Sequence, residues 1–224
     1  MSRRRLAILA SLAGLSALVV AMASVRVVYT GTDYYSNLVW NLFLAWIPFG
    51  VAVYAYDGYR KGVGRLQLWA AGGLWLLFFP NALYIVTDFK WLRVWGGAPI
   101  WYDILLVSAA AWGGLLLGFA SLYLIQEIVR RALGPVRAWA FAFVTLALGA
   151  FGVYLGRFER WNSWDVFTRP RLIGGRLLPH LAHPQDHPQA LATMVLFTAF
   201  LAMSYLVFYA FAQPEVERLR DDRP

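Results

Sequence analysis

The sequence contains no cysteine, and charged residues make up only 14% of its 224 residues. A chain without cysteine has no disulfide, no thiol nucleophile and no thiolate metal site. It also has no nucleophile motif, no glycine-rich phosphate loop and no His-Glu-x-x-His helix. These absences exclude the enzyme classes that short motifs reveal, and we expect no cofactor.

What the chain has instead is long apolar runs. Hydrophobic residues make up 60% of the sequence, and the mean hydropathy is +0.55. Runs of about 20 residues match the roughly 30 Å of hydrocarbon in a bilayer. We therefore predict an all-α polytopic transmembrane bundle, one domain over 1–224. Its six spans are predicted at 6–25, 38–56, 66–86, 104–125, 138–156 and 190–212, with a loop at 157–189 and a tail at 213–224.

The basic residues predict the orientation of these spans. A net charge of +8 would indicate nucleic acid binding in a soluble protein. Here the basic side chains lie in short connections, where orientation and anionic lipid headgroups account for them, so no nucleic acid partner is expected. With both termini cytoplasmic, twelve basic residues lie inside and eight outside. Five of those eight belong to the long loop, which we expect to lie along the outer interface.

The first apolar run allows two interpretations. Three arginines precede Leu6–Val25, and the run ends near Ala21-Met22-Ala23, as a cleavable secretory signal does. The run is long for a signal sequence, so we favour a retained span. Both interpretations place the following residue on the same side of the membrane.

Polar residues interrupt the third run in its outer half. The stretch Phe78–Asp88 contains Pro80, Asn81, Thr87 and Asp88, and each polar group there needs a partner or water. We assign Pro80 a structural role, because proline removes one backbone hydrogen bond of the helix.

Other polar residues fall at the same predicted depth. Asn37 and Asn41 share one face at the start of the second span, and Asp103 begins the fourth. Arg157 follows the fifth span and is expected to pair with Asp88 or Asp103 when the site is empty. The predicted polar outer cluster comprises Asn37, Asn41, Asn81, Asp88, Asp103, Arg157, Glu159, Arg160, Asn162 and Asp165. The alternative is that these groups only tie the bundle together.

Small residues predict close helix contacts. Gly114 and Gly118 are four apart in the fourth span, and Gly152 and Gly156 are four apart in the fifth. Such spacing lets two helices approach closely. We expect packing within one chain here, and a further close crossing at Gly72-Gly73. The oligomeric state does not follow from these patterns.

Three histidines in the predicted outer loop raise the question of a metal site. They are His180, His183 and His187, with Asp186 among them. Prolines on both sides of the group prevent a regular helix from aligning them. We therefore favour a solvated turn segment over metal binding.

Several longer motifs resemble one known family. They are FFPNALYIVTDF at 78–89, WYD at 101–103, GGLLLGFASLY at 113–123, YLGRFERWNSWD at 154–165 and NLFLAWIPF at 41–49. Together they resemble the bacterial membrane-protein family catalogued as domain of unknown function 1361, over roughly residues 37–208. The resemblance implies a multi-pass protein of the bacterial inner membrane and carries no known activity or catalytic residue.

Three functions are compatible with these observations. The first is an outward-facing polar site that binds or transports a small ion or solute. The second is an outer-leaflet enzyme that acts on a lipid-linked or phosphorylated substrate, with arginines holding the phosphate. The third is a structural or assembly partner in the membrane. Expected partners are membrane lipids and a small ion, solute or lipid headgroup; we rank the binder or transporter first.

Overall fold

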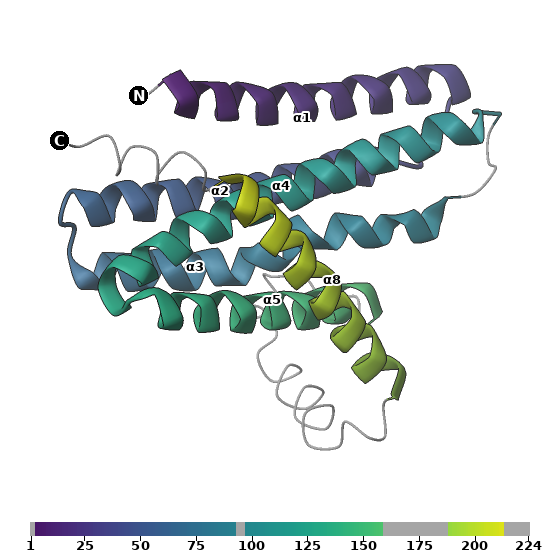
Figure 1. Ribbon diagram of the computed structural model, residues 1–224. Coiled ribbons are helices and arrows are strands. Elements are labelled where there is room, and N and C mark those ends of the chain that lie inside the picture. Colours follow the sequence, from purple (N-terminus) through teal and green to yellow (C-terminus); the bar gives the residue numbers. More distant parts are fainter. Residues whose placement is uncertain (1–2, 93–96, 159–187, 213–224) are drawn as a thin grey trace. The chain divides into compact units, whose positions relative to one another are not determined.

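The computed structural model describes residues 3–92, 97–158 and 188–212, and these residues are helical apart from short connections (Figure 1). The α-helices are α1 (Arg3–Thr30), α2 (Ser36–Arg60), α3 (Arg65–Tyr84), α4 (Ile100–Leu133), α5 (Pro135–Phe158) and α8 (Pro188–Ala212). A 3₁₀ segment, η1 (Ile85–Trp91), directly continues α3. The all-α prediction is confirmed for the described residues.

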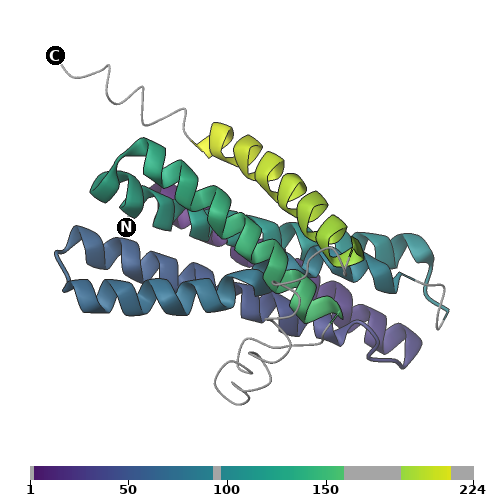
Figure 2. The same ribbon diagram turned by 90° about the horizontal axis from the view of Figure 1, so that it is seen from below.

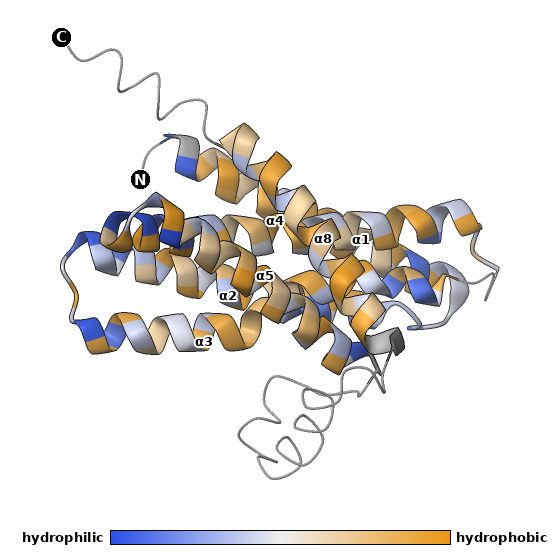
Figure 3. Ribbon diagram, turned by 60° about the horizontal axis from the view of Figure 1, so that its bottom comes forward, coloured by the Kyte–Doolittle hydropathy of each residue, from blue (hydrophilic) through white to orange (hydrophobic). Residues whose placement is uncertain are grey.

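Six described helices are long and apolar enough to cross a membrane, which confirms the predicted number of spans. Hydrophobic residues recur along the length of these helices (Figure 3), and many of them are exposed. Leu66, Trp69 and Val136 are each at least 80% exposed. A soluble monomer rarely exposes so much apolar surface, whereas lipid tails accept it without cost. The predicted loop 157–189 and tail 213–224 lie almost entirely outside the described residues.

The chain forms two compact units, Met1–Ile125 and Gln126–Pro224. The first unit contains α1, α2, α3, η1 and most of α4. Helices α2 and α3 run side by side as an antiparallel pair (Figure 2). The turn between them contains Gly62 at φ +74°, a conformation that glycine adopts without strain. Because the two helices run in opposite directions from this turn, the start of α2 lies beside η1, which follows the end of α3.

The core of the first unit is made of aliphatic and aromatic side chains from all its helices. Leu38 and Leu42 of α2, Ile85 of η1, and Leu106 and Leu117 of α4 are almost completely buried. Two indole hydrogen bonds cross between helices: Trp46 to the Ser16 hydroxyl, and Trp75 to the Ser121 hydroxyl. These bonds satisfy polar groups that would be costly to leave unpaired among apolar side chains.

Gly114 of α4 packs directly on the backbone at the end of α3. A Cβ on Gly114 would lie 2.6 Å from the carbonyl oxygen of Ala82, and one on Gly118 would lie 3.2 Å from the Leu83 Cδ2 atom. Gly114 therefore has no room for a side chain. Gly72 and Gly73 differ, because no described atom lies within 4 Å of their Cβ positions. The prediction of a close crossing there is wrong within the described residues.

Proline 80 lies inside α3, and the helix continues past it for one more turn. Its missing N–H leaves the Leu76 carbonyl without the usual helical donor. The helix then tightens into η1 after Tyr84. The predicted span 66–86 thus ends within a 3₁₀ segment, which turns Asp88 towards α2.

The second unit contains the end of α4 together with α5 and α8, which pack against each other. The buried Tyr205 hydroxyl of α8 donates a hydrogen bond to the Gln126 side chain. The Trp139 ring of α5 lies 4.6 Å from the Tyr209 ring, centroid to centroid. Gly152 and Gly156 lie in α5 and are half-buried.

Candidate functional site

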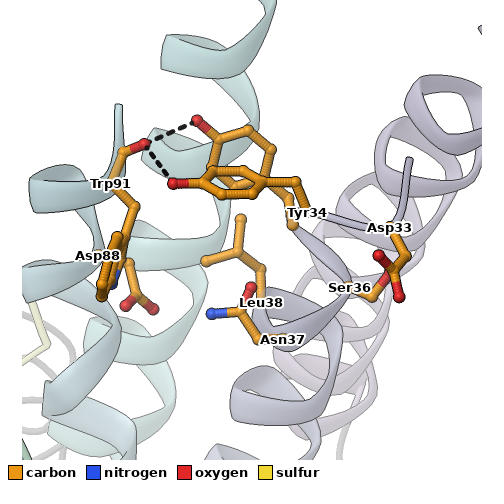
Figure 4. Close-up of a pocket in the computed structure, with 8 residues that line it drawn as sticks. Asp33, Tyr34, Ser36, Asn37, Leu38, Asp88 and Trp91 are labelled. Atoms are coloured by element: carbon orange, nitrogen blue, oxygen red, sulfur yellow. Dashed lines mark hydrogen bonds between the residues drawn. The ribbon is translucent and has the colours of Figure 1, made fainter. Parts of the chain in front are cut away.

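The first unit has a cavity of about 390 Å³ between the start of α2 and η1. It is lined by residues 33–38, Asp88 and Trp91 (Figure 4). Binding pockets for small molecules usually span about 300–1,000 Å³, so this cavity suits a small ligand. Its lining combines two carboxylates, one amide and three aromatic rings.

A tight connection between α1 and α2 positions the first wall. Helix α1 ends at Thr30, and the following Gly31 has a φ of +67° and donates its N–H to the Val27 carbonyl at 2.8 Å. The Ser36 N–H then bonds the Asp33 carbonyl at 2.8 Å and starts α2. Tyr34 and Tyr35 lie within this short turn, and its hydrogen-bonded backbone keeps both side chains at the cavity.

Asp88 is the buried charge of the cavity. Its side chain is only 2% exposed, and one of its oxygens accepts a hydrogen bond from the Asn41 amide at 3.2 Å. Asn37 lies one helical turn before Asn41, on the same face of α2. Figure 4 shows the Asn37 amide pointing towards the Asp88 carboxylate across the cavity. The structure thus brings together Asn37, Asn41 and Asp88, as expected from their predicted depth.

Two tyrosine hydroxyls close one side of the cavity. The hydroxyls of Tyr34 and Tyr35 donate to the Trp91 carbonyl at 3.5 and 3.3 Å, respectively. The Trp91 carbonyl ends the 3₁₀ segment, where backbone acceptors lack a helical partner. The two rings meet edge to face, with centroids 4.9 Å apart. These contacts link η1 to the start of α2 across the cavity (Figure 4).

A buried ion pair supports the tyrosine wall from behind. Arg26 of α1 donates to both carboxylate oxygens of Asp103, at 2.7 and 3.1 Å, and the two side chains are 2% and 1% exposed. The Arg26 guanidinium also lies 4.5 Å from the Tyr35 ring centroid, a cation–π contact. Nearby, the Tyr102 hydroxyl donates to the Met22 carbonyl at 2.8 Å and further joins α4 to α1.

Sequence reasoning missed Arg26, Tyr35 and Trp91. It ended the first span at Val25, so Arg26 counted only as an outer basic residue, whereas α1 continues to Thr30. A charge within a membrane helix is expected to have a partner, and that rule could have identified Arg26. The aromatic residues gave no such signal, because tyrosine and tryptophan are common at membrane interfaces.

Two residues of the predicted cluster do not line the cavity, one belongs to the second unit, and the rest lie outside the described residues. Asn81 donates to the Phe78 carbonyl at 3.1 Å within its own helix, and neither Asn81 nor Asp103 lines the cavity. Arg157 is half-buried near the end of α5, in the second unit. The remaining candidates lie outside the described residues: Glu159, Arg160, Asn162, Asp165, His180, His183 and His187. Among the described residues, no three His, Asp or Glu side chains form a metal-binding group.

The opposite end of the first unit has charged groups of a different kind. Arg5 and Asp57 form a bidentate pair at 3.0 and 2.7 Å, with about one third of each side chain exposed. In the second unit, Glu127 pairs with Arg130 and Arg131 on its own helix. Asp57 and Glu127 lie near the ends of α2 and α4, respectively.

Comparison with known proteins assigns the chain to a family. A family described as "Protein of unknown function (DUF1361)" matches residues 40–204. The chain belongs to this family. The resemblance seen in the sequence motifs is therefore confirmed. The DUF1361 match includes Asn41, Asp88 and Asp103, and starts after Arg26 and the two cavity tyrosines. No curated protein and no solved structure matches the chain.

Proposed function

We propose that this chain is a multi-pass protein of the bacterial inner membrane that binds or transports a small ion or solute. The site is the cavity between the start of α2 and η1, and it faces outward. Both termini are cytoplasmic in this proposal, which follows from the distribution of basic residues. Asp88 is the central binding group, and Asn37 and Asn41 assist it.

One observation carries the proposal: a carboxylate that is 2% exposed lines a cavity large enough for a ligand. Burying a charge costs several kcal/mol unless strong partners compensate. Apolar substitutions often stabilise such sites, so a buried charge beside a cavity in a membrane protein favours a functional role. The hydrogen bond from Asn41 fixes the orientation of the carboxylate at the cavity.

The separation of Asp103 from the cavity assigns a different role to that residue. Asp103 already has a bidentate arginine partner in Arg26. It acts as a structural support for Tyr35 through Arg26. The proposal therefore makes a specific prediction. A substitution at Asp88 should change the affinity for a ligand, whereas a substitution at Asp103 should change the stability of the fold.

The experiment uses the purified full chain in phosphatidylglycerol liposomes, with a panel of small cations and neutral solutes. Binding or uptake is measured for the wild type, Asp88→Asn and the matched control Asp57→Asn at the other end of the unit. We expect at least one probe to bind saturably to the wild type and Asp57→Asn, and at least about tenfold more weakly to Asp88→Asn. Equal affinity of every probe for all three proteins would contradict the proposal.

A further inference from the structure

The charged groups around the cavity determine which kind of ligand it favours. Among the described residues, its lining contains the carboxylates of Asp33 and Asp88 and no lysine or arginine. The start of α2 contributes the positive end of a helix dipole, equivalent to about half a charge. The two carboxylates of the described lining carry more charge than this half charge. The cavity therefore favours a cation over an anion.

The walls of the cavity are aromatic, and aromatic faces attract organic cations. The rings of Tyr35 and Trp91 already do so within the chain. The Arg26 guanidinium lies 4.5 Å from the Tyr35 centroid, and the Lys90 amine lies 5.7 Å from the Trp91 centroid. Tyr34 adds a third ring, which is 39% exposed. Cation–π attraction increases as water is excluded, as it is in a partly enclosed cavity.

Bare inorganic cations suit this lining less well. Calcium requires six to eight oxygen ligands, and magnesium keeps a hydrated octahedral shell. Rings and the Leu38 side chain occupy much of the wall here and offer no such ligands. An ammonium group with a short carbon chain matches both parts of the wall: its N–H groups reach the acceptors, and its carbons contact the rings.

We propose that the cavity binds an organic ammonium group, with the nitrogen at Asp88 and the carbon substituent against Tyr34 and Trp91. This inference rests on the proposed function of the same site. The cavity lining presents the Asp88 carboxylate and the Asn37 amide oxygen as acceptors for N–H groups, which favours a primary amine over a fully methylated one. The ammonium group belongs either to a free amine or to the headgroup of an ethanolamine lipid, since both carry the same chemistry.

Titrations of the purified full chain in phosphatidylglycerol nanodiscs test the inference. The probes are ethylammonium, the neutral propan-1-ol, the anion propionate, and sodium. We expect saturable binding of ethylammonium, at least about tenfold weaker binding of propan-1-ol, and none of propionate. The variant Asp88→Asn should weaken ethylammonium binding by at least about tenfold.

Exposed residues provide variants that keep the fold. Tyr34→Leu should weaken ethylammonium binding about 2- to 30-fold, because it removes one ring from the cavity wall. Lys90→Met should strengthen ethylammonium binding, because it removes a competing cation from the Trp91 ring. Trp69→Leu on the lipid-facing surface is the matched control and should change nothing.

The outcomes separate the inference from the proposed function. Sodium binding that depends on Asp88, without ethylammonium binding, would overturn the ammonium inference and leave an ion-binding site. Propan-1-ol binding as tightly as ethylammonium would likewise overturn the inference and leave a solute site. If no probe binds, the inference fails, and failure across the wider solute panel would also remove the proposed function.

A second arm identifies the source of the ammonium group. The ethylammonium titration is repeated in nanodiscs that contain phosphatidylethanolamine. Weaker apparent affinity in these discs supports a lipid headgroup as the occupant, because the lipid competes for the cavity. Unchanged affinity supports a free amine. An affinity that increases with phosphatidylethanolamine would contradict binding of both groups at one site.

Discussion

Helix α1 carries two bidentate arginine–aspartate pairs, one near each end, and they differ in burial. Arg5 pairs with Asp57, and about one third of each side chain is exposed. Arg26 pairs with Asp103, and the two side chains are 2% and 1% exposed. The two arginines are 21 residues apart, or about 32 Å along a helix, close to the thickness of the hydrocarbon layer.

The comparison shows how burial changes the role of the same chemistry. An exposed pair gains little, because water and salt screen it and each side chain loses freedom. A buried pair also gains little relative to apolar residues, but breaking it leaves an uncompensated charge. The buried pair additionally holds Tyr35, a wall of the cavity. The end of the unit with the buried pair is therefore the end with the candidate site.

The largest expected effect comes from breaking the buried pair. Arg26→Met leaves Asp103 buried without its arginine, and we expect the free energy of unfolding to fall by about 3–5 kcal/mol. The measurement is reversible unfolding in mixed detergent micelles. The double variant Arg26→Met with Asp103→Leu should recover most of this loss, since neither charge remains. A double variant no more stable than the single one would contradict this assignment.

The next largest effect on stability is expected from a steric clash at Gly114, a position where no charged group is involved. Gly114→Ala places a Cβ 2.6 Å from the Ala82 carbonyl oxygen, so the backbone must shift, at a cost of about 1–3 kcal/mol. Gly73→Ala is the matched control in open space and should stabilise α3 by up to about 1 kcal/mol. Similar unfolding free energies for the two variants would show that α4 does not pack on α3 as described.

Two substitutions at Tyr35 separate the contribution of its hydroxyl from that of its ring. Tyr35→Phe removes the hydrogen bond to the Trp91 carbonyl and keeps the ring over Arg26, so we expect a loss of about 0.5–1.5 kcal/mol. Tyr35→Leu also removes the cation–π contact and should cost about 0.5–2 kcal/mol more. The unfolding free energies of the two variants measure each step. Equal losses would mean that the Arg26 contact contributes nothing.

The smallest effect is expected at the exposed pair. Asp57→Asn should change the unfolding free energy by only about 0.2–1 kcal/mol, and 1 M salt should abolish most of that difference. Arg26→Met should keep its larger effect in the same salt, because buried pairs are screened much less. A salt-independent loss for Asp57→Asn would show that this pair is buried in the membrane as well.

Much of the fold was predictable because it depends on hydrophobic length. Six apolar runs predicted six helices, and Asn37, Asn41 and Asp88 were placed together from depth and helical spacing alone. The predicted spans at 6–25 and 104–125 were shorter than α1 and α4, because helices continue beyond the apolar segment. Helix ends depend on local hydrogen bonds that hydropathy does not measure.

The detailed contacts of the site were not predictable in the same way. The pairing of Arg26 with Asp103 joins residues 77 apart in sequence, and several acidic groups lay at the same predicted depth. Depth alone could not choose among them, and the sequence named Arg157 as the partner of Asp88 or Asp103. Asp103 pairs with Arg26, and a pairing of Arg157 with Asp88 stays a prediction. Gly72-Gly73 had the composition of a close crossing, but no described side chain packs there. Composition therefore identified the depth of polar groups, and only packing assigned their partners.

A direct titration of ethylammonium into the wild-type chain, Asp88→Asn and Asp57→Asn, all in phosphatidylglycerol nanodiscs, tests the central claim most directly. The two variants carry the same chemical change at opposite ends of one unit. The account predicts that Asp88→Asn raises the dissociation constant by at least about tenfold, whereas Asp57→Asn leaves it within about twofold. Equal dissociation constants for all three proteins would contradict the claim that the cavity at Asp88 is the binding site.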